Sequence, residues 1–323
     1  MRPLSSSSSS FIAPEPPASH GQPVFPDIQL HSPSSSETGE HAASKRNADE
    51  EAVFVVNGSS RGIGLQFVKS LAEKTKGKII ACCRSPTAAH ELNKVASKYS
   101  DQIHILPLDV ESQPSIDALA STLAQKYQRV DALFNVAGIL GDGKNMPGPE
   151  RSLANIERDW MEKTLAVNVI GPTMLAKGLA PLMRTTGRRT VKMNVISDDN
   201  SESLEVALPT GRPPTVICNL SARVGSISDN QLGGWYSYRM SKSALNQATR
   251  TMALELKRQG TFIVALHPGT TNTDLSKPFQ RNVKENRLFP VEFTVSQLLA
   301  VVDSMGNEHT GGFYDWSGTA LPF

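Results

Sequence analysis

Six short apolar runs, each followed by a longer segment with helical spacing, constrain the fold of this chain more than any other feature. The apolar runs cover residues 52–57, 78–83, 103–108, 132–135, 215–220 and 262–266. Apolar residues recur three and four positions apart over 62–74, 87–98, 115–127, 160–183 and 238–259. This alternation is typical of βαβ units, and near-continuous apolar strands indicate a sheet covered on both faces. We therefore expect an α/β fold: a single domain with a doubly wound parallel sheet.

The first fifty residues differ in composition from the rest. Residues 5–10 are an unbroken serine run, and six prolines lie between positions 14 and 33. Such a segment cannot bury enough apolar surface to order itself, so we expect residues 1–50 to be a disordered leader and 51–323 the folded domain. Serine is abundant in transit peptides, but Arg2 is the only lysine or arginine before Lys45. Cytoplasmic and plastid or other organellar locations both stay open.

Charge and cysteine usage narrow the range of functions. The 33 basic and 31 acidic residues form no long block in the folded part, so neither a nucleic acid nor a membrane surface is an expected partner. Cys82, Cys83 and Cys218 lie in apolar runs without metal-ligand or disulfide spacing, which favours a reducing compartment and no metal site. Asn168 and Pro172 interrupt the most apolar region, so we expect no membrane span of about 20 residues.

The segment 185–214 is too long for an ordinary connection. It contains several arginines, two adjacent aspartates and three prolines. We expect an inserted loop or hairpin beside the site, with 191–196 as an extra strand.

A glycine-rich turn joins the first predicted strand to the first helix. Its sequence is Asn57-Gly58-Ser59-Ser60-Arg61-Gly62-Ile63-Gly64. Glycines let the backbone turn sharply and approach a pyrophosphate, whose charge then meets the amides at the start of the helix. The turn between a strand and a helix predicts a Rossmann-like dinucleotide site that includes Gly58, Ser60, Arg61, Gly62, Ile63 and Gly64.

The end of the second strand indicates which dinucleotide binds. A carboxylate there would bind the ribose hydroxyls of NAD. This chain has Arg84 instead, with Arg61 inside the glycine turn. Two guanidinium groups can clamp a 2′-phosphate, so the sequence favours NADP(H) over NAD(H). The alternative is that both arginines are solvated surface charges.

Two further strand ends carry candidate cofactor contacts. Asp109, followed by Val110, is placed to accept a hydrogen bond from the adenine amino group, although Asp at this position is also an ordinary helix cap. Asn135, Ala137 and Gly138 place small residues where the backbone would pass the ribose, and the alternative is a simple tight turn.

Tyr238 and Lys242 are four residues apart in a helical segment, which puts both on one helix face. A nearby ammonium stabilises a phenolate and lowers the pKa of the tyrosine, so Tyr238 could exchange a proton with a substrate oxygen while hydride moves at carbon. The alternative is a boundary tyrosine beside a solvent-facing lysine. Tyr236 competes for the role, but the residue four positions after it is the uncharged Met240.

These motifs, together with Asn168 and Pro268-Gly269, resemble in order the short-chain dehydrogenase/reductase family from Val53 to about Tyr314. Residues 219–226, 233–235, 267–269 and 274–279 look like its C-factor branch, near the sniffer-type carbonyl reductases.

The resemblance implies a role for each matching position. Tyr238 would be the general acid-base, Lys242 would bind the nicotinamide ribose and tune Tyr238, and the backbone of Asn168 would hold a water in the proton relay. Pro268, Gly269 and Thr273 would lie at the nicotinamide, with Thr273 bonded to its carboxamide. The family's subunit contacts also imply a homodimer or homotetramer through the helices beginning near Trp160 and Tyr238.

One position departs from the family pattern. Ala222 occupies the place of the usual substrate-orienting serine, so Ser221, or less directly Ser226, is expected to supply that hydroxyl. Two hypotheses follow: an NADP(H)-dependent oxidoreductase acting on a small carbonyl or alcohol substrate, or a non-catalytic NADP(H)-binding or signalling protein of C-factor type.

Overall fold

A seven-stranded parallel sheet forms the centre of the computed structural model, which describes residues 39–141, 148–197, 200–283 and 287–323. Its strand order is β11-β8-β7-β4-β1-β2-β3. The strands are β1 (Val53–Asn57), β2 (Lys78–Cys83), β3 (Ile103–Pro107), β4 (Ala132–Asn135), β7 (Thr215–Leu220), β8 (Thr261–His267) and β11 (Phe313–Asp315). The first strand, β1, lies in the middle of the sheet. The strands β2 and β3 are added on one side of it and β4, β7, β8 and β11 on the other, so the winding direction reverses between β1 and β4. This confirms the expected doubly wound, Rossmann-like fold, in which ligands bind outside the carboxyl ends of the strands at such a reversal.

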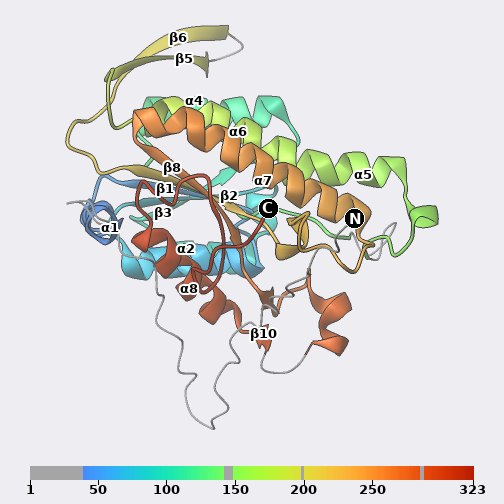
Figure 1. Cartoon of the computed structure of the whole chain (residues 1–323). Coiled ribbons are helices and arrows are strands. Elements are labelled where there is room, and N and C mark those ends of the chain that lie inside the picture. Colours follow the sequence, from blue (N-terminus) through green and yellow to red (C-terminus); the bar gives the residue numbers. More distant parts are fainter. Residues whose placement is uncertain (1–38, 142–147, 198–199, 284–286) are drawn as a thin grey trace.

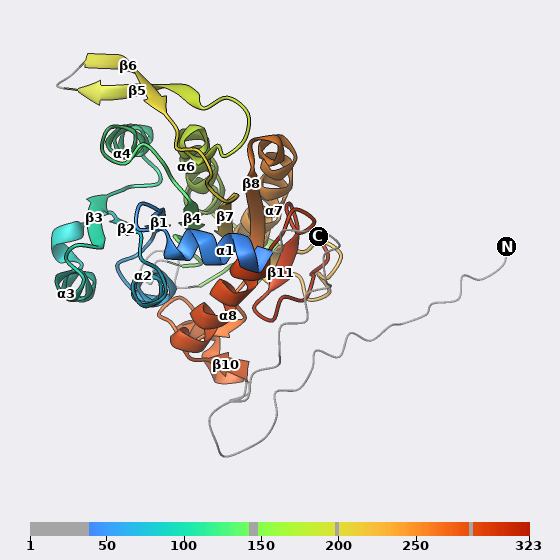
Figure 2. The same cartoon turned by 90° about the vertical axis from the view of Figure 1, so that its left-hand side faces the viewer.

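Helices cover both faces of the sheet (Figures 1 and 2). One face is packed by α2 (Gly62–Lys74), α3 (His90–Lys98) and α8 (Val291–Ser304), and the other by α4 (Gln113–Lys126), α6 (Gly171–Leu179) and α7 (Tyr236–Leu256). Along β1, Phe54 and Val56 face the first layer while Val53 and Val55 face the second. The continuous apolar run of the strand therefore feeds two cores at once.

The expected disordered leader is too long by about ten residues, because Gly39–Ala48 form the helix α1. Charged and polar contacts help to hold this helix. Arg46 is buried, and its guanidinium bonds Asp303 on α8 at 3.3 Å and the carbonyl of Pro214 at 3.4 Å. Composition alone could not reveal a helix held by partners more than 160 positions away.

The inserted segment forms an antiparallel hairpin of β5 (Thr190–Ser197) and β6 (Asn200–Ala207) that stays separate from the central sheet. It packs on α4, where the Ile196 amide donates to the Ser121 hydroxyl at 3.0 Å (Figure 2). The expectation that it lies beside the site is wrong. The Thr185 amide donates to the carbonyl of Gln259, just before β8, so the insertion leaves the domain at the amino ends of the strands.

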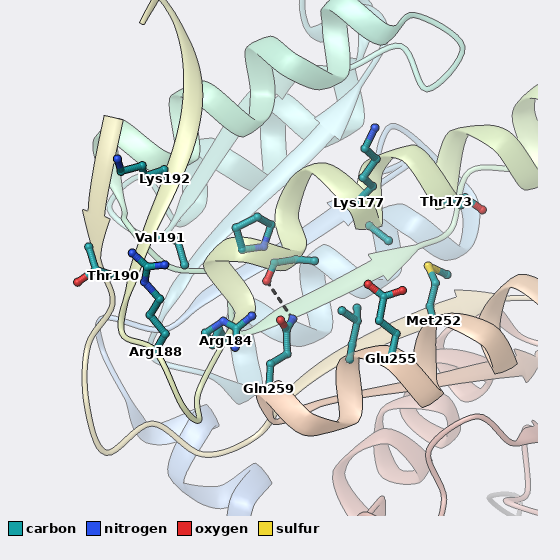
Figure 3. Close-up of a pocket in the computed structure, with 14 residues that line it drawn as sticks. Thr173, Lys177, Arg184, Arg188, Thr190, Val191, Lys192, Met252, Glu255 and Gln259 are labelled. Carbon is teal, nitrogen blue, oxygen red and sulfur yellow. Dashed lines mark hydrogen bonds between the residues drawn. The ribbon is translucent and has the colours of Figure 1, made fainter. Parts of the chain in front are cut away.

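A groove of about 790 Å³ lies at the base of this hairpin, between α6 and α7 (Figure 3). Its lining includes Lys177, Arg184, Arg188, Lys192 and Glu255. Because it opens at the amino ends of the strands, it is remote from the glycine turn and from Tyr238.

The helical run Arg158–Met183 is long and apolar enough to cross a membrane by length and composition alone, contrary to the expectation from the sequence. It comprises α5 (Arg158–Leu165), a π-helical turn (Ala166–Ile170), α6 and a 3₁₀ turn. Leu175, Leu179 and Leu182 are fully buried in the core against the sheet, and a core helix passes the same test.

Smaller elements complete the carboxyl-terminal part. The two-residue strands β9 (Thr270–Thr271) and β10 (Leu288–Phe289) pair with each other, and Lys277–Asn282 form a 3₁₀ helix.

Candidate active site

The glycine turn lies between the carboxyl end of β1 and the amino end of α2, and it is too crowded for side chains at two positions. Gly58 has φ +69°, and a Cβ there would lie 2.7 Å from the Ala137 amide. A Cβ on Gly64 would lie 2.2 Å from the carbonyl oxygen of Gly58. Without side chains at these positions the backbone of the turn runs directly to the positive end of α2, which suits a pyrophosphate.

A row of buried side-chain amides supports this turn. Asn57, Asn135 and Asn219 are register partners at the ends of β1, β4 and β7. Each donates to the next, at 2.7 Å and 2.8 Å, and Asn219 donates to Thr249 on α7 at 2.8 Å. The Asn57 oxygen accepts from the amides of Val136 and Ala137, both at 2.8 Å. The sequence interpretation used only Asn135, although an asparagine near the end of each strand was a usable signal.

The two arginines have different surroundings. Arg61 is 78% exposed and lies 3.5 Å from the carboxylate of Asp274. Arg84 is exposed directly after β2 and has no ion pair among the described residues. Arg84 is therefore the freer of the two to bind an anionic group.

Asp109 is half-buried after β3, and its carboxylate accepts from the Glu111 amide at 3.1 Å. The helix cap of α4 is Ser112, which accepts from the Ser115 amide. The alternative interpretation of Asp109 as a helix cap is therefore wrong. The next residue, Val110, is buried against Gly171, where a Cβ would lie 2.8 Å from that of Val110.

Asn168 lies in the π-helical turn, a local distortion that recurs at functional sites. Its buried side chain binds both backbone groups of Ile139 at 2.9 Å and donates to Ser241 on α7 at 3.0 Å. A Cβ on Gly138 would lie 3.3 Å from Asn168 Oδ1 and 3.7 Å from Lys242 Nζ. Three predicted site residues therefore converge on one place.

Tyr238 and Lys242 share a face of α7, with Lys242 Nζ 5.6 Å from the centre of the tyrosine ring. Burial lowers the pKa of Lys242 to about 8. Burial raises the pKa of Tyr238 above its ordinary value, so the expected net lowering of this pKa is wrong. Desolvation outweighs an ammonium at this distance. The phenol is consequently protonated at neutral pH and can act as a proton donor.

The serine candidates are occupied by other partners. The Ser221 hydroxyl is buried and donates to Asn246 at 2.6 Å, so its one proton does not point to a substrate. The Ser226 hydroxyl accepts from the Asp229 amide at 3.1 Å. The expectation that Ser221 replaces the usual serine is therefore not supported.

Thr273 faces the glycine turn, since its methyl carbon would lie 3.6 Å from a Cβ on Gly62. The Pro268-Gly269 turn lies beside aromatic rings: a Cβ on Gly269, which has φ +71°, would lie 2.5 Å from Phe289 and 3.0 Å from Trp316.

Sequence reasoning missed Glu150, a buried residue whose side chain lies against the first turn of α7. Its carboxylate accepts from the Ser237 hydroxyl and from the Ser237 amide. No motif marks this glutamate, because its partner is almost ninety positions away.

The chain is similar to known proteins over most of the described domain. The family model of short chain dehydrogenase matches residues 52–204 and 211–284. The NADPH-bound carbonyl reductase from chicken fatty liver is 28% identical, covers 84% of this chain and 99% of its own, and has a TM-score of 0.69. The carbonyl reductase Sniffer of D. melanogaster is 29% identical, with coverages of 85% and 100% and the same TM-score of 0.69. C-signal of Myxococcus xanthus is 30% identical over 60% of this chain and 93% of its own.

The family match spans the glycine turn, the asparagine row and the Tyr238–Lys242 pair, and it confirms the resemblance stated from the motifs. The chain therefore belongs to the short-chain dehydrogenase/reductase family of oxidoreductases.

Proposed function

We propose that the protein is an NADP(H)-dependent carbonyl reductase in which Tyr238 gives a proton to the substrate oxygen. The observation that carries the proposal is the convergence of Tyr238, Lys242, Asn168 and Gly138 at the carboxyl ends of the strands. The relatives described as carbonyl reductases, one of them with NADPH bound, support the same activity.

The glycine turn fits a dinucleotide, because Gly58 and Gly64 leave room that a Cβ would fill. Gly62, Ser60 and Ile63 complete this cradle. Asp109 and Val110 would flank the adenine, Ala137 and Gly138 the ribose, and Thr273 the nicotinamide. Arg84, assisted by Arg61, would bind the 2′-phosphate of NADP(H). The bound cofactor supplies the hydride.

The residues of the chain supply the proton chemistry. The protonated Tyr238 phenol donates to the carbonyl oxygen as negative charge develops there. Below about pH 8, Lys242 is charged and stabilises the phenolate that remains. The Ser241 hydroxyl donates to the Tyr238 carbonyl and accepts from Asn168, which fixes this turn of α7 relative to Ile139.

Tyr238→Phe tests the assignment. This variant should lose at least about 100-fold in carbonyl-dependent NADPH oxidation, in line with general acid catalysis, while NADPH binding stays unchanged. Tyr236→Phe is the matched control and should keep the wild-type rate. Unchanged turnover in Tyr238→Phe would contradict the catalytic role.

A non-catalytic NADP(H)-binding or signalling protein is the second candidate. It is favoured by Ala222, by the engagement of Ser221 with Asn246, and by the similarity to C-signal. Tight NADPH binding without turnover on a panel of aldehydes and ketones would support it against the reductase.

A further inference from the structure

Trp235, the residue before α7, has an unusual backbone conformation. Its φ is +56°, and in the described ranges only Gln128 among the other non-glycine residues has a positive φ. This conformation is unfavourable for a bulky side chain and persists only where neighbouring groups impose it. Such positions cluster at functional sites.

Glu150 imposes the conformation. Its backbone carbonyl accepts from the Trp235 amide at 2.5 Å, and its carboxylate accepts from the amide of Ser237 at 3.3 Å and from the Ser237 hydroxyl. Glu150 is 2% exposed and Ser237 is fully buried. The carboxylate lies at the positive end of a 21-residue helix, which stabilises its charge. One residue thus fixes both the turn before α7 and the first turn of the helix.

The held indole lies between the proposed acid and a second aromatic ring. Its centroid is 6.3 Å from that of Tyr238, with the planes at 67°, and 4.9 Å from that of Phe279. Phe279 belongs to the 3₁₀ helix Lys277–Asn282. The aromatic pair of Trp235 and Phe279 therefore lies on one side of the Tyr238 ring.

We propose that Trp235 is a specificity-determining residue that selects carbonyl groups attached to an aromatic ring, and that Glu150 is the positioning residue that holds it. The inference rests on the proposed reductase activity. An aromatic substrate would replace water on the indole and gain ring contacts, which an aliphatic chain gains only in part.

Trp235→Gly tests the inference with little backbone disturbance, because glycine adopts a positive φ without strain. The probes are benzaldehyde and hexanal, with NADPH saturating. We expect kcat/KM for benzaldehyde to fall roughly tenfold or more, mainly through KM, and that for hexanal to change by less than about threefold. NADPH affinity and the circular dichroism spectrum should match those of the wild type.

Two further variants test the positioning role of Glu150 and provide a control. Glu150→Gln, which loses the charge at the helix terminus, should shift the preference toward hexanal in the same direction as Trp235→Gly. Leu254→Ala, at a 65% exposed residue more than four helical turns along α7 from Tyr238, should leave the preference unchanged. An aldehyde preference in Trp235→Gly equal to that of the wild type would overturn the inference and leave the reductase intact. Wild-type protein that reduces neither aldehyde would overturn the reductase proposal, and this inference with it.

Discussion

The ammonium of Lys242 is anchored to the last residue of β7, because its Nζ donates to the carbonyl oxygen of Leu220 at 2.8 Å. Burial lowers the pKa of this ammonium to about 8. As pH rises through that value the charge beside Tyr238 disappears, and with it the stabilisation of a phenolate. We expect kcat/KM for carbonyl reduction to fall as pH rises through about 8, measured by steady-state NADPH oxidation.

Stability should change in the opposite direction over the same range. The folded pKa of Lys242 is below its ordinary value of 10.5, so the unfolded chain binds the extra proton between about pH 8 and 10.5. The contribution of this residue to the free energy of unfolding therefore increases with pH there. Lys242→Met should remove both trends. A wild-type reduction rate that stays constant as pH rises through 8, in protein that remains folded, would contradict the assignment.

Cofactor preference should depend on Arg84. Charge-assisted hydrogen bonds contribute about 1.5–3 kcal/mol, so Arg84→Ala should raise the KM for NADPH roughly 10- to 100-fold and change that for NADH much less. Arg188→Ala, at an exposed arginine in the distant groove, is the matched control. Equal losses with both cofactors would mean that Arg84 does not read the 2′-phosphate.

Ala222→Ser should increase turnover. Both neighbouring hydroxyls have other partners: Ser221 donates to Asn246, and the buried Ser226 hydroxyl accepts from the Asp229 amide and lies 3.4 Å from the hydroxyl of Ser228. Deleting one oxyanion donor typically costs 10²- to 10³-fold, so restoring a hydroxyl should raise kcat by about tenfold or more. A cysteine has nearly the same shape as a serine, but its thiol is a poor hydrogen-bond donor. Ala222→Cys should therefore stay near the wild-type rate. If the serine variant also stays there, a missing hydroxyl does not limit the reaction.

The sequence predicted those parts of the fold that depend on local pattern. The apolar runs of β2, β4 and β7 gave the observed bounds, because each strand is buried on both faces. The pattern did not reveal β11, which has only three residues. It also did not reveal α1, in which Ala43 is the one buried apolar side chain. Both elements are fixed by partners elsewhere in the chain.

The candidate site divides in the same way. The glycine turn and the spacing of Tyr238 and Lys242 are encoded within a few residues, so motifs located them. The direction of the Tyr238 pKa, the engagement of Ser221 with Asn246 and the positive φ of Trp235 depend on tertiary contacts. A hydroxyl in the right place along the sequence can still point to a different partner, as Ser221 does.

Residues 39–49 should contribute measurably to stability, although their composition resembles that of a leader. Arg46 bonds Asp303, and Asp49 bonds the buried Arg129 at 2.7 Å, while Arg129 also bonds Asp131 beneath β1. Breaking a buried ion pair leaves an uncompensated charge and costs about 3–5 kcal/mol. Asp303 keeps Lys74 as a partner, which places the expected loss from Arg46→Met at the lower end, about 3 kcal/mol.

A chain beginning at Gly39 and one beginning at Glu50 isolate this contribution, because both lack residues 1–38. We expect the shorter chain to melt about 5–10 °C lower, given roughly 2–4 °C per kcal/mol for a domain of this size. Arg46→Met in the longer chain should account for much of the difference, whereas Lys45→Met, at an exposed neighbour, should not. Equal melting temperatures for the two chains would mean that α1 adds nothing to the domain.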